Sequence, residues 1–233
     1  MRILVGKHSG FCFGVKRAVD MALKEAEAGE SAVYSYGNII HNETVVEALK
    51  EKGVRPVETT EGLRAGDTLI IRAHGAPPRL YAECAARGIR TVDATCPFVR
   101  RIHKLVSSAA ETGMTVYIAG KANHPEVVGI QGHAGDRARV LETAADAENA
   151  PKTARACIVA QTTLSREQYE GIVHALEGRI SDLTVYDTIC DTTRQRQNEA
   201  ALLAEKCTKI FVIGSKMSAN TVRLEEICKK KCE

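Results

Sequence analysis

Short runs of β-branched and apolar residues alternate along the chain with longer segments in which apolar residues recur three and four positions apart. The short runs predict buried strands, and the longer segments predict amphipathic helices. The predicted strands cover residues 2–5, 32–36, 68–72, 90–92, 115–119, 156–160, 183–186 and 209–213. The predicted helices include residues 15–28, 44–52, 78–87, 98–112, 166–177 and 194–206. This alternation predicts an α/β fold with parallel sheets.

A cysteine recurs three times in the same local setting. Cys12, Cys96 and Cys190 each follow a predicted strand, open a predicted helix and precede a basic residue by four positions. A single cysteine in such a place is more often a small buried hydrophobic residue. Three matched copies instead indicate a shared role.

A second motif repeats at a nearly constant distance from these cysteines. Each copy begins with Gly and has His or Ser four positions later, Glu or Asn six positions later and Val eight positions later. The His or Ser residues of the three copies are His41, His124 and Ser218. These residues follow their cysteines by 29, 28 and 28 positions. A third motif, a strand that ends in a polar residue, contains His74 and Thr162 and has no third copy.

The repeats predict three homologous α/β units. We place them at residues 1–95, 96–189 and 190–233, with small parallel sheets arranged as a pseudo-symmetric trefoil. Because the third motif lacks a third copy, we interpret the third unit as incomplete. Roughly the last 40 residues are therefore expected to be poorly ordered or to need another chain.

The turns that follow parallel strands lie at the carboxyl edge of a sheet, where such folds bind ligands. One ring of side chains there is expected to hold the three cysteines. A neighbouring ring is expected to hold His41, His74, His124, Glu126, Thr162, Ser218 and Asn220. Helix starts beside neutral imidazoles and hydroxyls favour an anion such as a diphosphate. The plainer alternative is that the histidines cap helices and that Glu126 is a first-turn acid.

Composition narrows the choice of protein class. The chain of 233 residues is 44% apolar and 26% charged, as in globular proteins, and its net charge of +3 is too small to indicate a nucleic-acid partner. No run of about 18 apolar residues predicts a membrane span. The first residues resemble a strand and not a signal peptide, so we expect a cytoplasmic protein with reduced thiols.

The three repeated cysteines favour a metal centre. Three thiolates suit either zinc with one histidine or an iron–sulfur cluster whose last iron lacks a protein ligand. Their separations of 84 and 94 positions argue against structural zinc, whose ligands come in close pairs. Of the other cysteines, we expect Cys84, Cys157 and Cys207 to be buried hydrophobic residues and Cys228 and Cys232 to face the surface or a partner.

Other candidate residues have ordinary interpretations. Surface or satisfied core positions are expected for His8, His103, His133 and His174. The basic residues that follow the three cysteines, Lys16, Arg100 and Arg194, either pair with acids or helix ends or offset the charge of a cluster.

Several motifs together resemble the 4-hydroxy-3-methylbut-2-enyl diphosphate reductase family of the non-mevalonate isoprenoid pathway. The resemblance covers nearly the whole chain and rests on Gly10-Phe-Cys-Phe-Gly-Val15, His41-Asn, Ala73-His-Gly75, Asp93-Ala-Thr-Cys-Pro97, His124-Pro-Glu126-Val, Gln161-Thr-Thr-Leu-Ser165, Asp187-Thr-Ile-Cys190 and Gly214-Ser-Lys through Asn220. Members of this family continue with a segment that completes the third unit and supplies another serine.

The resemblance implies a 4Fe-4S cluster held by Cys12, Cys96 and Cys190. It implies substrate contacts from His41, His74, His124, Thr162, Ser218, Ala219 and Asn220. Glu126 would donate protons, and Thr162 would contact the substrate hydroxyl. The implied reaction removes the allylic hydroxyl of (E)-4-hydroxy-3-methylbut-2-enyl diphosphate, with electrons from a ferredoxin or flavodoxin, and yields isopentenyl and dimethylallyl diphosphate. Neither a nucleic acid nor a membrane is an expected partner.

Two alternatives belong to other classes. The chain is a redox-inert module that binds phosphorylated metabolites, with structural or zinc-binding cysteines, or it is a fragment without function. Visible absorbance and iron content separate the first alternative from the reductase.

Overall fold

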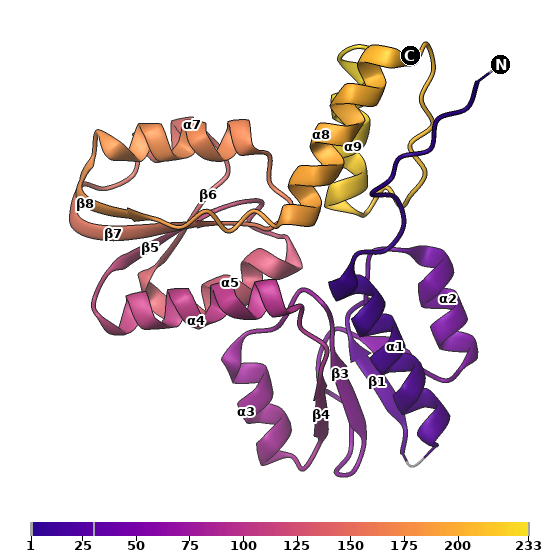
Figure 1. The fold of residues 1–233 in the computed structure, drawn as a ribbon. Helices are drawn as coiled ribbons and strands as arrows, with labels where there is room; N and C mark the ends of the chain where they lie inside the picture. Colours follow the sequence, from indigo (N-terminus) through magenta and orange to yellow (C-terminus); the bar gives the residue numbers. More distant parts are fainter. Residues whose placement is uncertain (1, 30, 233) are drawn as a thin grey trace.

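The computed structural model describes residues 2–29 and 31–232 and contains two parallel sheets of four strands each (Figure 1). The first unit has strand order β2-β1-β3-β4. Its elements are α1 (Phe13–Ala28), β1 (Val33–Tyr36), α2 (Glu43–Glu51), β2 (Arg55–Val57), β3 (Thr68–Ile71), α3 (Pro78–Ala86) and β4 (Arg90–Asp93).

The second unit repeats this arrangement with strand order β6-β5-β7-β8. Its elements are α4 (Pro97–Glu111), β5 (Thr115–Ala119), α5 (Pro125–Ala134), the 3-10 helix η1 (Gly135–Arg137), β6 (Ala138–Leu141), α6 (Ala144–Glu148), β7 (Thr153–Ala160), α7 (Arg166–Glu177) and β8 (Ile180–Val185). In each sheet the second strand of the unit lies at the edge and the first and third are central. The α/β fold with parallel sheets is confirmed, whereas the trefoil and the unit boundaries stay predictions.

Strand β3 is buried on both faces because helices cover both sides of its sheet (Figure 1). Leu69, Ile70 and Ile71 of β3 are completely buried, and such continuous apolar runs are typical of parallel sheets. The edge strands β2 and β6 were not predicted from the sequence. Strand β2 reads Arg-Pro-Val, and a proline is tolerated only where one side of a strand needs no hydrogen bond.

Two predicted strands, residues 2–5 and 209–213, are wrong. Both segments are irregular, and their apolar side chains are exposed: Val5 by 77%, Phe211 by 85% and Ile213 by 94%. A strand forms only where a neighbour satisfies its backbone groups and covers its side chains. Within the described chain, neither segment pairs with another strand.

The residues after Cys190 form two helices and no sheet. Helices α8 (Asp191–Lys206) and α9 (Ala219–Lys229) pack side by side, next to the N-terminal segment (Figure 1). Cys228, expected to face the surface or a partner, is 6% exposed, because α9 turns it inward. Cys84 and Cys157 are completely buried as expected, whereas Cys207 is half-buried.

No helix in residues 2–29 and 31–232 combines the length and apolar character that crossing a membrane requires.

Candidate active site

Three helices begin at the three repeated cysteines. Cys12, Cys96 and Cys190 are the N-terminal caps of α1, α4 and α8. All three line one cavity of about 450 Å³, and none is in a disulfide. The unpaired N–H groups and the dipole of a helix start stabilise a thiolate, so these are favourable places for metal-binding sulfur.

The helix starts approach one another closely. A Cβ atom at Gly14 would lie only 2.6 Å from Sγ of Cys96, so only a glycine lets α1 come this near to the start of α4. Desolvation raises the pKa of the Cys96 thiol, while the N–H groups of Phe98 and Val99 lower it. At the start of α8, Sγ of Cys190 accepts a hydrogen bond from the N–H of Thr193 at 3.3 Å.

The donor set fits a cluster better than a single metal ion. Among the described residues, the one group of His, Cys, Asp or Glu whose ligand atoms all lie within 4.8 Å of each other is His41, His74 and His124. Within the described residues, no such close group contains Cys12, Cys96 or Cys190, although all three line one cavity. Thiols that surround a common cavity without being that close are what a multi-iron cluster requires.

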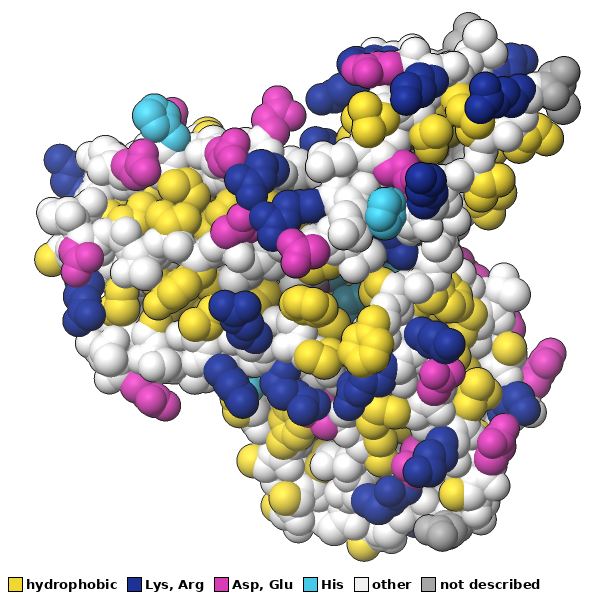
Figure 2. All heavy atoms as spheres, viewed as in Figure 1, with side chains coloured by type: hydrophobic (Ala, Val, Ile, Leu, Met, Phe, Trp, Pro, Cys, Tyr) yellow, Lys and Arg dark blue, Asp and Glu magenta, His cyan; other side chains and the backbone are white. Residues whose placement is uncertain are grey.

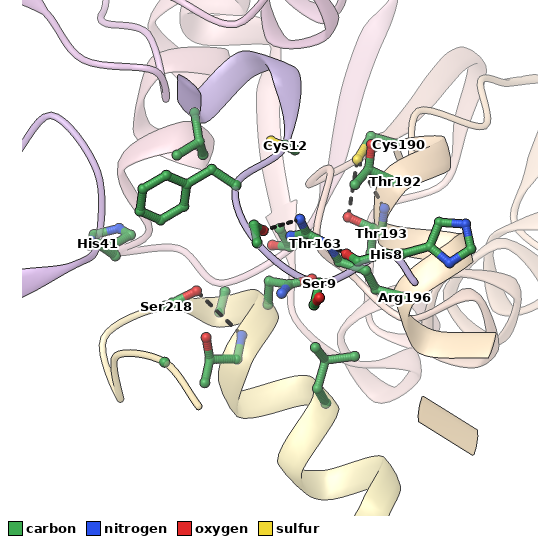
Figure 3. Close-up of a pocket in the computed structure, with 18 of the residues that line it drawn as sticks. His8, Ser9, Cys12, His41, Thr163, Cys190, Thr192, Thr193, Arg196 and Ser218 are labelled. Carbon is green, nitrogen blue, oxygen red and sulfur yellow. Dashed lines mark hydrogen bonds between the residues drawn. The ribbon is translucent and has the colours of Figure 1, made fainter. Parts of the chain in front are cut away.

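The three histidines form a compact group across the cavity. The ring centroids of His41 and His74 are 4.6 Å apart. The ring centroid of His124 lies 5.8 Å from that of His41 and 5.4 Å from that of His74. Figure 3 shows His41 and Ser218 across the pocket from Cys12 and Cys190. Both ring nitrogens of His41 and Nδ1 of His74 are buried without a hydrogen-bond partner. Because buried polar atoms are nearly always paired, these orphaned nitrogens indicate a missing ligand.

The imidazoles are neutral at physiological pH. Burial lowers the pKa of His124 to about 4 and that of His74 well below its usual value, and burial also lowers the pKa of His41. The positive charge of Arg72 acts in the same direction on all three. The tautomer of His124 follows from its capping bond: Nδ1 accepts the N–H of Glu126 at 3.2 Å, so Nε2 carries the hydrogen.

Glu126 and Thr162 are joined by two short hydrogen bonds. The N–H of Thr162 donates to Oε1 of Glu126 at 2.6 Å, and its hydroxyl lies 2.7 Å from Oε2. The two residues are 2% and 7% exposed. Burial raises the pKa of Glu126 to about 7, although both bonds from Thr162 favour the carboxylate. This carboxyl group is thus poised to hold or release a proton near neutral pH.

The start of helix α9 also lines the cavity. Ser218 caps this helix by accepting the N–H of Thr221 at 3.3 Å, and Ala219 and Asn220 follow in its first turn. Nearby, the buried hydroxyl of Ser215 donates to Glu43 at the start of α2 at 2.8 Å, which ties the segment before α9 to α2. The same cavity is lined by every predicted site residue: Cys12, His41, His74, Cys96, His124, Glu126, Thr162, Cys190, Ser218, Ala219 and Asn220.

Sequence reasoning missed several residues around the cavity. His8 is exposed, in agreement with the surface position expected for it, but it also lines the cavity next to Arg196, which donates to its carbonyl at 2.9 Å (Figure 3). Arg72 has a buried Nε without a partner, and desolvation lowers the pKa of its guanidinium. Neither His8 nor Arg72 belongs to a repeated motif, so only the tertiary structure reveals that they lie near the site.

His103 lies behind the histidine group. It is 5% exposed, stacks on His133 with ring centroids 4.0 Å apart, and has a pKa lowered to about 3 by burial. A Cβ at Gly75 would lie 2.4 Å from Cε1 of His103. Gly75 adopts φ of 79°, so it both turns the backbone after His74 and makes room for the His103 ring.

Comparison with known proteins gives consistent matches. A family model described as "LytB protein" matches residues 3–233. The 4-hydroxy-3-methylbut-2-enyl diphosphate reductase of Caldanaerobacter subterraneus subsp. tengcongensis is 42% identical over 236 residues, which cover 100% of this chain and 82% of that protein. The enzyme of the same name from Clostridioides difficile is 39% identical over 98% of this chain and 82% of its own length.

Solved structures agree with these matches. A structure titled "(E)-4-Hydroxy-3-methyl-but-2-enyl Diphosphate Reductase, the Terminal Enzyme of the Non-Mevalonate Pathway" superposes with a TM-score of 0.78 at 39% identity, covering 99% of this chain and 83% of that one. The E-1-hydroxy-2-methyl-but-2-enyl-4-diphosphate reductase of Plasmodium falciparum superposes with a TM-score of 0.90 at 28% identity, covering 95% and 71%.

Proposed function

The chain belongs to the LytB protein family, and from this premise we propose that it is an oxidoreductase that removes the allylic hydroxyl of (E)-4-hydroxy-3-methylbut-2-enyl diphosphate. The products are isopentenyl and dimethylallyl diphosphate. One observation carries the proposal: three cysteines at helix N-cap positions, three neutral imidazoles and a buried carboxyl group all line one cavity.

The reaction balances as a two-electron reduction. The substrate takes up two electrons and two protons, one C–O bond breaks, one C–H bond forms and water leaves. The electrons come singly from a protein donor, which we propose to be a ferredoxin or flavodoxin. The chain itself must then bind the diphosphate, orient the hydroxyl and deliver a proton to it.

We propose that Cys12, Cys96 and Cys190 hold a 4Fe-4S cluster. The fit rests on the three thiols, their favourable helix starts and the space that Gly14 leaves beside Cys96. When bound, such a cluster supplies single electrons and Lewis-acid chemistry.

The diphosphate would be bound by His41, His74 and His124 together with the start of α9. The neutral imidazoles donate N–H hydrogen bonds, and the orphaned nitrogens of His41 and His74 are available for this. Ser218 and Asn220 add side-chain donors, and Ala219 offers its backbone N–H at a helix start. The positive field of Arg72 favours the anion from behind the histidines.

The proton would travel from Glu126 through Thr162. Oε1 of Glu126 accepts the backbone N–H of Thr162, so the acidic hydrogen belongs on Oε2. In the structure the Thr162 hydroxyl donates to Oε2 at 2.7 Å. When Oε2 carries the hydrogen, this bond reverses, so that the hydroxyl accepts that hydrogen and turns its own hydrogen into the cavity. A shift along this pair protonates the departing hydroxyl, which leaves as water.

Anaerobic purification tests the proposal. We expect a brown protein with about four irons per chain that reduces the diphosphate substrate when supplied with reduced viologen. A colourless zinc protein without turnover would instead support a redox-inert module that binds phosphorylated metabolites. The cytoplasmic location stays a prediction from the sequence.

A further inference from the structure

Two phenylalanines are exposed in the first turns of helices α1 and α4. Phe13 directly follows Cys12, Phe98 lies two positions after Cys96, and their exposed fractions are 68% and 48%. Both line the same cavity as the three cysteines. On the face shown in Figure 2, hydrophobic side chains gather at the junction of the first two units, with Lys and Arg side chains around them. Large aromatic side chains left open to water next to a site often mark an interaction surface.

Basic residues accompany these phenylalanines without local partners. The first turns of α1 and α4 contain no acidic residue, and α4 carries Arg100, Arg101 and Lys104 before its first acid, Glu111. Arg100 pairs with Asp93 at 2.9 Å. Within the described chain, no ion pair is made by Arg101, by Lys104 or by Lys16 of α1.

Local stability does not account for these charges. Lys16 lies near the positive end of α1, where a cation does not stabilise the helix, and Arg101 and Lys104 lie beyond the first turn of α4, where the helix dipole has little effect. Lys16, Arg101 and Lys104 are also exposed, so burial does not fix them. Unpaired positive charges around exposed aromatic rings are complementary to an acidic protein, because aromatic anchors supply contact area and rim charges steer association.

We propose that Phe13, Phe98, Lys16, Arg101 and Lys104, here termed the Phe–Arg surface, dock an acidic one-electron carrier protein. This inference rests on the proposed function, because only a reductase needs such a carrier. Each docking event oxidises the carrier by one electron and reduces the protein by one electron. Two events therefore supply the two electrons that the reaction consumes.

The test compares two double charge reversals in the iron-loaded protein. R101E/K104E reverses two charges of the Phe–Arg surface. R137E/K152E makes the same change at exposed positions directly before β6 and β7, at the amino edge of the second sheet and away from the cavity. Binding of an acidic ferredoxin is measured by calorimetry at several salt concentrations, and turnover is measured with reduced ferredoxin and with reduced methyl viologen.

We expect R101E/K104E to raise the Kd of ferredoxin about tenfold or more at low salt and to flatten its salt dependence. Turnover at limiting ferredoxin is expected to fall by a similar factor, and turnover with viologen is expected to stay within about twofold of the wild type. The control variant should match the wild type in every measurement.

Three results would overturn the inference. They are unchanged ferredoxin binding in R101E/K104E, an equal loss in R137E/K152E, or an equal loss of turnover with viologen, which would mean that the charges act on the reducing centre. F98S provides an independent check, since it leaves all charges in place and should weaken ferredoxin binding at every salt concentration. If the wild type reduces no substrate with viologen, the proposed function fails, and the calorimetry still decides whether this surface binds the carrier.

Discussion

Replacing Glu126 by glutamine tests the proton path with almost no change in shape. The glutamine carbonyl still accepts the N–H of Thr162, which now bonds Oε1 at 2.6 Å, and its amide N–H donates to the Thr162 hydroxyl. The variant therefore keeps both contacts but has no proton to transfer. General acid catalysis contributes roughly 10²- to 10⁴-fold, so we expect turnover to fall by about that factor, or about 3 to 5 kcal/mol in the barrier.

The pH dependence gives a second signature. Because the pKa of Glu126 is raised to about 7, half of the wild-type molecules carry the proton at that pH. Above it the protonated fraction falls about tenfold per pH unit, so wild-type turnover should fall with rising pH while the residual activity of Glu126→Gln stays flat.

Stability should respond to the same group. The pKa of Glu126 in the folded protein lies above the ordinary value of 4.5. The contribution of protonated Glu126 to the stability of the folded state is therefore complete below pH 4.5 and is lost as the pH rises through 7. The difference between the two pKa values corresponds to about 3 kcal/mol of unfolding free energy. It is measured by following with pH how the unfolding free energies of the wild type and Glu126→Gln differ.

The assay uses reduced viologen under anaerobic conditions, so that carrier docking plays no part. Iron content must equal that of the wild type, and Glu148→Gln, at an exposed helical site, serves as the matched control. Turnover of the iron-loaded Glu126→Gln variant within about threefold of the wild type would refute the role of Glu126 as general acid.

Three further variants probe other parts of the site. Cys96→Ser should lose its iron while Cys157→Ala, a change in the core of the second unit, keeps it; an unchanged iron content in Cys96→Ser would exclude Cys96 as a ligand. His41→Asn should raise KM about ten- to a hundredfold with little change in kcat, because one hydrogen bond to a charged group contributes about 1.5–3 kcal/mol, and an unaltered KM would argue against diphosphate binding there. Gly75→Ala should lower the unfolding free energy in urea by about 1–3 kcal/mol, because φ of Gly75 is 79° and the new Cβ would collide with His103. In the control Gly178→Ala the new Cβ meets no atom within 4 Å, so equal stability of the two variants would contradict this reasoning.

The sequence predicted the parts of the fold that depend on local pattern. Central strands such as residues 115–119 agree with β5 because a strand buried on both faces is apolar throughout. Edge strand β6 was not predicted because its Ala-Arg-Val-Leu run has only four residues and is interrupted by Arg139. Residues 209–213 have the composition of a strand, but pairing depends on a neighbour that composition does not specify.

The site was predictable to the extent that it repeats. Cys96 and His124 were identified because equivalent residues recur at fixed spacing, and each caps a helix in the structure. Arg72 and His103 have no repeated counterpart, and what distinguishes them is burial without full hydrogen bonding. Such orphaned atoms result from packing between units, which a sequence pattern does not encode.

Placing the site at helix starts explains why its histidines can remain neutral. Thiolates at Cys12, Cys96 and Cys190 together with a diphosphate would concentrate negative charge in one cavity, and each lies at the positive end of a helix. Helix dipoles and N–H groups stabilise that charge without a protonation step, so protonated imidazoles are not needed. Burial can then lower the pKa of His124 to about 4 without loss of anion binding, while the same burial raises that of Glu126 to about 7. Burial in one cavity thus keeps the anion-binding imidazoles neutral and lets Glu126 exchange a proton near neutral pH.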